Sequence, residues 1–238
     1  MKLKKNKELE LSIIIPLFNE QDTIKIILEK INNINIFKEI IVINDGSNDN
    51  SLNILKSNDY LYDYLLSFKK NRGKGFACKK GLEISNGKFV IIQDADLEYN
   101  PKNYIDLLNE TKNGYKVVYG SRVLKGGNIS NQGGLRPVLS KFANFILTKL
   151  SNFVNKQKLT DAHTCYKLFD RNIIQKIDLR EKRFAFCPEV TTKIAKLGIQ
   201  IKEVPIDYTG RSYKEGKKIK LSDAFEAIFA LIRYNYFK

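Results

Sequence analysis

Residues 11–47, LSIIIPLFNEQDTIKIILEKINNINIFKEIIVINDGS, decide the fold class, because they hold two apolar runs with a helical repeat between them. Leu11–Ile15 is short and rich in isoleucine, which is typical of a buried strand, and the proline that follows closes it. Apolar residues then recur at helical spacing from Asp22 to Ile31. Glu39–Ile43 is a second apolar run, and the turn residues NDGS end it. The stretch therefore predicts a strand, a helix and a second strand.

The same alternation continues beyond this unit. The further strands expected are Tyr62–Phe68, Lys88–Gln93 and Lys116–Tyr119, and the helix expected among them is Gly75–Ser85. Strands that alternate with helices pair mainly in parallel, so the predicted fold is α/β, a Rossmann-like, doubly wound sheet flanked by helices. Ligands of such sheets bind beyond the carboxyl ends of the strands. The polar clusters of this sequence stand at those ends.

The second half of the chain has a different pattern. A Gly/Asn-rich loop is expected first, followed by an amphipathic helix, a late strand, a basic loop and a final helix, at Gly126–Gly134, Leu135–Phe153, Gln200–Ile206, Lys214–Lys220 and Leu221–Phe237. Pro137 is compatible with the first turn of its helix. The sequence shows no internal repeat and no linker between domains, and its length suits one α/β domain with appendages.

Composition narrows the class of partner. The 238 residues include 41 Lys and Arg against 26 Asp and Glu, a formal net charge of +15. This excess favours anionic partners, namely nucleic acid, acidic lipid surfaces or phosphorylated substrates. Cys78, Cys165 and Cys187 are scattered and odd in number, which argues against a disulfide framework or a zinc site and indicates a reducing, cytoplasmic setting.

Membrane-targeting patterns are not recognisable in the sequence. Met1–Glu10 is charged and lacks the apolar core of a signal peptide. No stretch approaches the roughly 20 apolar residues that a spanning helix needs. We therefore expect a soluble or peripheral protein.

The motif with the clearest chemistry is Gln93-Asp94-Ala95-Asp96-Leu97-Glu98, which follows an apolar strand. In extended chain, residues two apart point to the same side, so Asp94, Asp96 and Glu98 are expected to converge. Clustered carboxylates repel one another unless a cation relieves them, and hard oxygen ligands suit Mg²⁺ or Mn²⁺. The motif predicts a metal site, and the alternative is an acidic turn.

Two other strand ends carry polar residues. Asp45 can accept hydrogen bonds from a nucleobase or a ribose, although an Asp-Gly turn has the same sequence. Asn19 and Glu20 follow the first strand, where either could instead cap the next helix. Three polar strand ends in one parallel sheet favour a shared cleft over three independent turns.

Cationic residues stand near the same ends. The segment Asn71-Arg72-Gly73-Lys74-Gly75 precedes a helix, and its amides and cations suit a phosphate group. It is not the GxxxxGK[ST] loop, and no GxGxxG occurs, so NTP hydrolysis and dinucleotide binding lose support. Arg122 follows a strand and could pair with a phosphate; the alternative is a surface arginine. His163, the single histidine, is expected to be structural or exposed.

Together these motifs resemble the inverting family 2 glycosyltransferases of the GT-A fold, in particular the branch of dolichyl-phosphate and polyprenyl-phosphate mannosyl- and glucosyltransferases. The resemblance extends from about Leu11 to Tyr234. The matching stretches are Ile15–Glu20, Asn44–Ser47, Asn71–Gly75, Gln93–Asp96, Gly120–Arg122, Thr160-Asp161 with Thr164–Lys167, and Arg211–Tyr213 with Glu215–Ile219. Each alone is weak, and their order and spacing together are specific.

The resemblance implies a role for each matching residue. The residues implied for the nucleotide-sugar donor are Pro16, Phe18, Asn19, Glu20, Ile43, Asp45, Lys74, Asp94, Ala95, Asp96, Arg122, Arg211, Lys217 and Lys218. Asp94, Asp96 and Arg122 form the implied catalytic set, and Asp96, Asp94 and Glu98 the implied ligands of Mg²⁺ or Mn²⁺. The acceptor region would contain Asp161, His163, Tyr166 and Lys167. The sequence departs from the family pattern in two ways. Asn44 stands where relatives often have an acidic residue, and the C-terminal membrane spans of many lipid-phosphate enzymes are not recognisable in it.

The resemblance also implies a domain plan. Residues 1–10 are expected to be a flexible basic N-terminus, and residues 11–210 the GT-A domain, with the acceptor region from about 125. Residues 211–238 are expected to be a basic loop and an amphipathic helix. That helix could lie on the cytoplasmic face of an anionic membrane, or pack on the domain or on a partner subunit.

The reaction implied is transfer of a hexose, with inversion, from a UDP- or GDP-sugar to a polyprenyl phosphate. A lipid phosphate is already ionised near neutral pH and needs no strong general base. A saccharide or protein hydroxyl does need one, and Asp161 would be the candidate. The alternatives from other classes are a sugar nucleotidyltransferase and a basic nucleic-acid-binding protein, although the carboxylate motif argues against nucleic acid as a partner.

Overall fold

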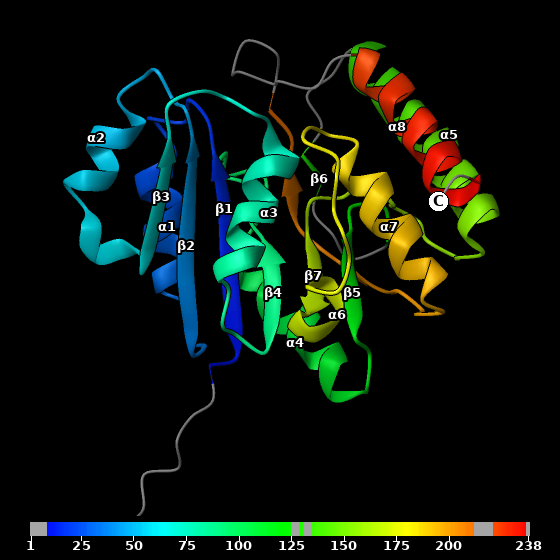
Figure 1. The fold of residues 1–238 in the computed structure, drawn as a ribbon, viewed down its shortest axis with the longest axis horizontal. Coiled ribbons are helices and arrows are strands. Elements are labelled where there is room, and N and C mark those ends of the chain that lie inside the picture. Colours follow the sequence, from blue (N-terminus) through cyan, green and yellow to red (C-terminus); the bar gives the residue numbers. More distant parts are fainter. Residues whose placement is uncertain (1–8, 125–128, 131–134, 212–220, 237–238) are drawn as a thin grey trace, which may run out of the picture.

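The computed structural model of the protein describes residues 9–124, 129–130, 135–211 and 221–236 (Figure 1). Within them a seven-stranded sheet has the order β3-β2-β1-β4-β7-β5-β8. Its strands are β1 (Leu11–Leu17), β2 (Lys38–Asp45), β3 (Tyr64–Phe68), β4 (Phe89–Ile92), β5 (Val117–Ser121), β7 (Lys167–Asp170) and β8 (Lys202–Pro205). All neighbouring pairs except those of β7 are parallel, which confirms the predicted mainly parallel α/β sheet.

The strand β7 was not predicted, and it changes the topology. It lies between β4 and β5 and is antiparallel to both, with Phe169 opposite Val90 on one side and opposite Val117 on the other. Consequently β4 and β5 run in the same direction, and β7 begins at the edge where they end. The segment that precedes Lys167 is thereby brought to the carboxyl ends of the parallel strands.

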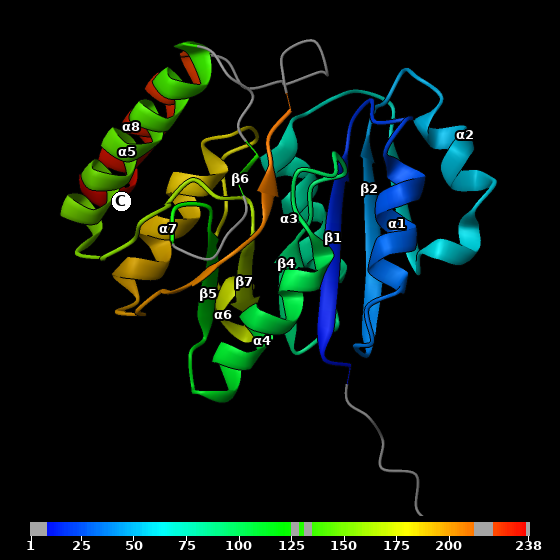
Figure 2. The ribbon, with the colours of Figure 1, turned by 180° about the vertical axis from the view of Figure 1, so that it is seen from behind.

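Helices cover both faces of the sheet (Figures 1 and 2). One face packs against α1 (Ile24–Asn32) and α4 (Tyr104–Lys112), and the other against α3 (Lys74–Ile84) and α7 (Phe186–Lys196). Side chains alternate along β1, so Ile13 and Ile15 belong to the first core and Ile14 to the second. This two-sided burial is the reason that the strands have apolar runs rather than an alternating pattern.

The predicted elements occur, with shifted ends. The strand β1 continues through Pro16 to Leu17, so the prediction that the proline closes it is wrong. The strand β1 pairs with β4 only as far as Ile14, so β4 is no longer paired with it at Pro16. Proline, which has no N–H to donate, is tolerated at such a position. The short elements not predicted are α2 (Ser51–Lys56), α6 (Arg171–Ile174), and the 3₁₀ helices η1 (Asp59–Leu61) and η2 (Pro101–Asn103); α4 and α7 were not predicted either.

Two long helices lie side by side at the end of the molecule that is remote from α2 (Figures 1 and 2). They are α5 (Leu135–Asn155) and α8 (Leu221–Tyr236), which pack on each other and on α7. The inward side of α5 is polar: Asn144 donates to Asp161, and the Asn152 amide bonds both backbone groups of Leu159. The outward side is apolar, so the apolar stripe predicted for this helix faces away from the sheet.

A small second sheet pairs β6 (Ile129–Ser130) with β9 (Tyr208–Thr209). Apart from Ile129 and Ser130, the residues of the predicted Gly126–Gly134 loop lie outside the described residues. The same is true of the basic loop Lys214–Lys220 and of residues 1–8, for which the sequence predicts a flexible N-terminus.

Candidate active site

The polar residues predicted at the strand ends meet at one edge of the sheet. The strands β1, β2 and β4 are mutually parallel, and β5 runs in the same direction across β7. The residues that follow these strands, among them Glu20, Asp45, Asp94 and Arg122, therefore share that edge. This arrangement confirms the geometric expectation drawn from the parallel sheet.

Asp94 forms an ion pair with Lys74, the first residue of α3. The Lys74 ammonium also donates to Cys165 Sγ at 2.9 Å. Burial lowers the pKa of Lys74, but the acidic groups around it, the Asp94 carboxylate foremost, together outweigh burial and hold this pKa well above its usual value. Burial raises the pKa of Asp94, and Lys74 more than offsets it. Both groups are therefore charged near neutral pH, and Lys74 contributes to the site as a cation.

The turn after Asp94 differs from the expectation of an extended chain. The strand β4 ends at Ile92, residues 95–96 form a turn, and Leu97 has a left-handed backbone with φ of 63°. This conformation is strained for a residue with a branched side chain. Because the chain turns here, the side chains of Asp94, Asp96 and Glu98 do not alternate as they would along a strand.

The Glu98 carboxylate faces β9 and Arg211, which stands two residues beyond this strand. Its Oε2 accepts a hydrogen bond from the Tyr208 hydroxyl at 2.9 Å, and its Oε1 accepts one from the backbone N–H of Arg211 at 2.7 Å. The carbonyl oxygen of Glu98 accepts from the Thr209 N–H. Glu98 therefore fastens the segment 208–211 to the turn, and its role as a metal ligand stays a prediction.

Arg211 joins two carboxylates from neighbouring strand ends. Its guanidinium lies 2.9 Å from Glu20 Oε2 and 2.8 Å from Asp96 Oδ2. Burial, together with the Asp94 and Glu98 carboxylates, raises the pKa of Asp96 to about 7, because Arg211 offsets only part of their effect. Asp96 is thus a carboxylate that lacks sufficient positive charge in the free protein.

The donor set suits a hard divalent cation. The described ranges contain no ready-made group of three or more His, Cys, Asp or Glu side chains that could hold a metal. The excess negative charge at Asp96 is nevertheless what a bound cation would relieve, and Mg²⁺ characteristically takes one or two carboxylates together with substrate phosphates. The chemistry of Asp94 and Asp96 therefore fits such an ion.

Asp45 anchors the loop that was predicted to hold phosphate. Its Oδ1 and Oδ2 each accept from the backbone N–H of Arg72 at 3.0 Å, and Oδ2 also accepts from that of Gly73 at 2.6 Å. Gly73 has φ of 103°, and a Cβ there would lie 2.4 Å from the carbonyl oxygen of Lys182. The loop thus requires glycine at this position, and Asp45 fixes its place over the strand ends.

Arg122 is held by Asp161 in a two-point ion pair. The distances are 2.7 Å from Nε to Oδ2 and 2.8 Å from Nη2 to Oδ1, and the backbone N–H of Arg122 also donates to Oδ2. Burial raises the pKa of Asp161, but Arg122 outweighs it and lowers the pKa to about 2. Glu203 accepts from the backbone N–H groups of Thr160 and Asp161 and so fixes the segment. Asp161 is therefore poorly suited to accept a proton.

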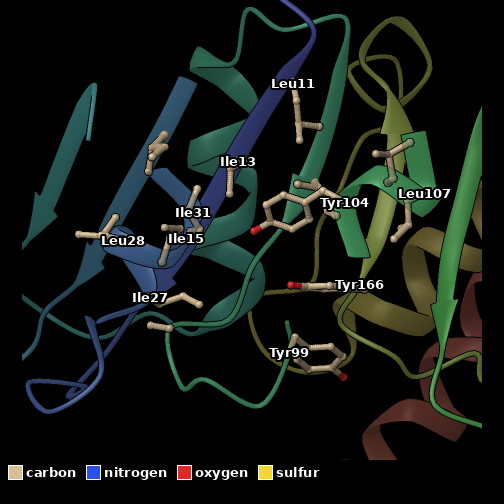
Figure 3. Close-up of a cluster of buried hydrophobic side chains, with 14 of the residues drawn as sticks. Leu11, Ile13, Ile15, Ile27, Leu28, Ile31, Tyr99, Tyr104, Leu107 and Tyr166 are labelled. Atoms are coloured by element: carbon tan, nitrogen blue, oxygen red, sulfur yellow. The ribbon is translucent and has the colours of Figure 1, made fainter. Parts of the chain in front are cut away.

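The other residues predicted for the acceptor region are largely internal. Tyr166 has no exposed surface, stacks on Tyr99 at 4.7 Å, and shares Gln93 Oε1 as hydrogen-bond acceptor with Tyr104 (Figure 3). Lys167 is equally buried and donates to the carbonyl oxygens of Ala162 and Thr164. These two side chains support the region from within the core and do not line its surface.

His163 is half-buried and uncharged at neutral pH. Burial lowers its pKa to about 4, and the nearby Lys167 ammonium contributes to this. Its Nε2 is buried without a hydrogen-bond partner in the described part of the chain. The sequence predicted that this histidine is structural or exposed, and its buried Nε2 favours the structural alternative.

The remaining residues predicted for the donor fall into three groups. Pro16, Phe18 and Asn19 are partly exposed at the end of β1, and Asn19 bonds Ser47 and Asn48 across the strand ends. The side chains of Ile43 and Ala95 are buried in the core, so neither presents a pocket surface in this structure. Lys217 and Lys218 lie outside the described residues.

The prediction from sequence missed Tyr208 and Cys165 as members of the site. The centre of the Tyr208 ring lies 5.1 Å from the Arg122 guanidinium carbon, and its hydroxyl donates to Glu98, so Tyr208 links Arg122 to the Glu98 carboxylate. Cys165 contacts Lys74. No local pattern marks either residue, although Cys165 stands within the motif stretch 160–167.

Comparisons with known proteins identify the family of this chain. The family model described as Glycosyl transferase family 2 matches residues 12–178. The chain is 32% identical to a dolichyl-phosphate beta-glucosyltransferase of Dictyostelium discoideum, over 84% of this chain and 66% of that protein. It is 28% identical to the polyprenol monophosphomannose synthase of Mycolicibacterium smegmatis, over 93% of this chain and 85% of that protein.

A solved structure has the same fold. The glucosyl-3-phosphoglycerate synthase from Mycobacterium tuberculosis, in complex with Mn²⁺ and UDP-glucose, superposes with a TM-score of 0.69. The match covers 95% of this chain and 79% of that one at 16% identity, which shows a shared fold.

Proposed function

Because the chain belongs to glycosyl transferase family 2 and is a glycosyltransferase of the GT-A fold, we propose that it transfers a hexose from a UDP- or GDP-sugar to a polyprenyl phosphate. The observation that carries this proposal is the pairing of buried carboxylates with cations at the strand ends. Asp94 and Asp96 lie beside Lys74 and Arg211 at this edge. A nucleoside diphosphate needs both kinds of group, cations for its phosphates and carboxylates for its counter-ion.

The donor is proposed to lie over the ends of β1, β2 and β4. Asp45 and the loop that it anchors would border the nucleoside, together with Phe18 and Asn19. Lys74 and Arg211 would bind the diphosphate, and Asp96 and Asp94 would hold Mg²⁺ or Mn²⁺. When bound, such a cation neutralises the charge that develops on the departing diphosphate. The Mycobacterium tuberculosis neighbour, which contains Mn²⁺ and UDP-glucose, supports this placement by analogy of fold.

The acceptor oxygen is proposed to attack the anomeric carbon in line. A bond forms between this oxygen and the anomeric carbon, while the bond from that carbon to the diphosphate oxygen breaks and takes its electron pair with it. The product has inverted configuration, and UDP or GDP leaves. In this proposal the residues of the chain align the donor diphosphate and the acceptor phosphate, and Arg122, which lies over the Tyr208 ring, would bind the acceptor phosphate.

The state of Asp161 favours a phosphate acceptor over a hydroxyl. A hydroxyl needs a base to remove its proton, and Asp161 was the candidate. With its pKa at about 2 and both oxygens bound by Arg122, Asp161 is poorly suited to this task. A phosphate monoester is already ionised and needs no base. The curated relatives, whose names specify dolichyl phosphate and polyprenol monophosphomannose, support the same acceptor class.

The test is a donor panel with purified protein. With Mn²⁺ and polyprenyl phosphate in detergent, we expect release of free UDP or GDP from one sugar nucleotide, and loss of release when lipid or metal is omitted. Release that does not depend on the lipid would move the acceptor to a saccharide or protein hydroxyl. Release of pyrophosphate from NTP and sugar phosphate would indicate a nucleotidyltransferase instead.

The surface of α5 and α8 supports contact with a membrane. No helix in the described part of the chain is long and apolar enough to cross a bilayer. Instead, each of the two helices has an exposed apolar stripe, and together these form the outer face, composed of Phe142, Phe145, Ile146, Phe153, Phe225, Phe229, Ile232 and Tyr236. The sequence of α5 contains no acidic residue, and Lys141 and Lys149 are exposed on it. Such a face suits the interface of an anionic bilayer.

We therefore expect the protein to co-sediment with anionic phospholipid vesicles at low salt. Replacing Phe142 and Phe145 together by Ser removes apolar area from the outer face, and should lower the partition coefficient by about tenfold or more. Phe37→Ser removes an aromatic ring of similar exposure at a site outside the outer face, and should leave binding unchanged. If the unaltered protein stays in the supernatant, the proposed contact with a membrane is wrong.

A further inference from the structure

The Arg211 guanidinium occupies the position of a counter-ion between two strand ends. It reaches Glu20 after β1 and Asp96 after β4, residues that are 191 and 115 positions away in the sequence. The side chains involved are only 10% to 17% exposed, so the interaction is little screened by solvent. The positive charge that Asp96 receives in the free protein thus comes from a side chain that belongs to a distant segment.

This side chain can leave Asp96 without unfolding the segment that carries it. The backbone N–H of Arg211 is bound by Glu98 at 2.7 Å, and Glu98 also binds the Tyr208 hydroxyl and the Thr209 N–H. These bonds fix the backbone independently of the guanidinium. A rotation of the arginine side chain alone therefore changes the occupancy of Asp96.

We propose that Arg211 is a built-in competitor of the divalent cation, which occupies Asp96 in the free protein and releases it only when a nucleoside diphosphate offers another anion. This inference rests on the proposed function, because it assumes that the cation binds at Asp96. Arg211 Nη2 lies 2.8 Å from Asp96 Oδ2, whereas a bound Mg²⁺ would stand about 2.0–2.1 Å from a carboxylate oxygen. Two cations on one oxygen repel each other strongly.

The consequence is coupling between metal and donor. In the free protein, metal binding has to displace Arg211 and is therefore weak. Once a diphosphate is present, the guanidinium has a second anion to pair with, and Asp96 becomes available. The metal and the nucleoside diphosphate should thus strengthen each other's binding by the same factor, as linkage requires.

The experiment is a titration with Mn²⁺ alone, followed by the paramagnetic resonance signal of free Mn²⁺ and by the melting temperature. Arg211→Ala should bind Mn²⁺ about tenfold more tightly than the unaltered protein when no nucleotide is present. Arg72→Ala is the matched control, because it removes one positive charge at the same edge from a guanidinium that packs on Phe68 and Phe76. We expect it to change Mn²⁺ affinity by less than about threefold.

Two further variants keep the outcome interpretable. Arg211→Lys retains the charge but cannot span Glu20 and Asp96 with a planar fork, so it should show a partial gain in Mn²⁺ affinity. Arg211→Lys also tests the proposal if Arg211→Ala fails to fold. Combining Arg211→Ala with Asp96→Asn should remove the gain, which would locate the tightened binding at Asp96.

The proposal is overturned if Arg211→Ala binds Mn²⁺ no more tightly than the unaltered protein, or no more tightly than Arg72→Ala. It is also overturned by a crystal structure with Mn²⁺ at Asp96 in which Arg211 still contacts Oδ2. Either result would leave sugar transfer intact. Failure of the proposed function itself has a different signature, namely no Mn²⁺ binding even with UDP or GDP and no release from any donor.

Discussion

Replacing Asp96 by Asn is expected to abolish sugar transfer and, at the same time, to raise the melting temperature of the metal-free protein. An amide is a weak ligand for Mg²⁺ or Mn²⁺, and loss of the proposed principal ligand should reduce turnover by about a thousandfold or more. In the free protein, however, the Asp96 carboxylate is unfavourable, because burial and the neighbouring carboxylates raise its pKa to about 7. Asn retains the shape without the charge.

The sign of the stability effect follows from linkage. A carboxyl group whose pKa is higher in the folded than in the unfolded protein binds its proton more tightly when folded. Its stabilising contribution is present below the unfolded pKa and is lost as pH rises toward 7. At pH 8, Asp96→Asn should therefore stabilise the metal-free protein by about 1 kcal/mol, which corresponds to roughly 2–4 °C.

Thermal unfolding in EDTA at pH 5 and pH 8 measures this effect, and the gain should be smaller at pH 5. UDP or GDP release measures the loss of transfer under the same buffer conditions with Mn²⁺ restored. Turnover close to that of the unaltered protein would remove Asp96 from the site. A lower melting temperature at pH 8 would show that the ion pair with Arg211 outweighs the repulsion among the carboxylates.

Replacing Asp161 by Asn should destabilise the protein by about 3 kcal/mol and lower its melting temperature by about 6–12 °C. Asp161 has no exposed surface, and it binds Arg122 at two points. The variant leaves the Arg122 guanidinium buried without its charge partner. The free energy lost in this way exceeds the net contribution of the intact ion pair to stability. The pKa of Asp161 is lowered to about 2 in the folded protein. The stability that Asp161 provides is therefore fully present above the pKa of the unfolded chain, and it is lost as the pH falls from there through the folded pKa of about 2.

The same variant distinguishes a positioning residue from a base. If Asp161 positions Arg122, transfer falls but the dependence of the remaining activity on pH keeps its shape. If Asp161 is a base for a hydroxyl acceptor, the acidic limb of the pH profile disappears. Asp178→Asn is the matched control, because Asp178 pairs with Arg180 at the surface with 63% of its side chain exposed, and its loss should leave the melting temperature almost unchanged.

The fold was largely predictable because its signals are local. The apolar runs at 11–15 and 39–43 and the helical repeat between them correspond to β1, β2 and α1. A strand buried on both faces must be apolar throughout, and such a run is visible without any tertiary information. The four-residue strand β7 was missed, since Lys167–Asp170 begins with a lysine and ends with an aspartate, and only its place between β4 and β5 makes it a strand.

The site was predictable in part. The carboxylates of Asp94 and Asp96 stand directly after an apolar strand, and the alternation of strands and helices implied that such ends meet. The direction of each side chain was not predictable, because the left-handed conformation of Leu97 turns Glu98 toward β9. Asp161 was considered as a base, and its pairing with Arg122 could not be inferred, since the two residues are 39 positions apart.

The sequence by itself determined the mainly parallel α/β class of the sheet, the edge at which the polar residues collect, and the family resemblance. These follow from short-range patterns of apolar and polar residues, which each segment carries independently of the others. Only the tertiary structure decided that β7 brings the segment before Lys167 to that edge, and that Arg211 reaches across to Asp96. Such contacts depend on how distant segments pack, and the energy of packing leaves no mark on the local sequence of either partner.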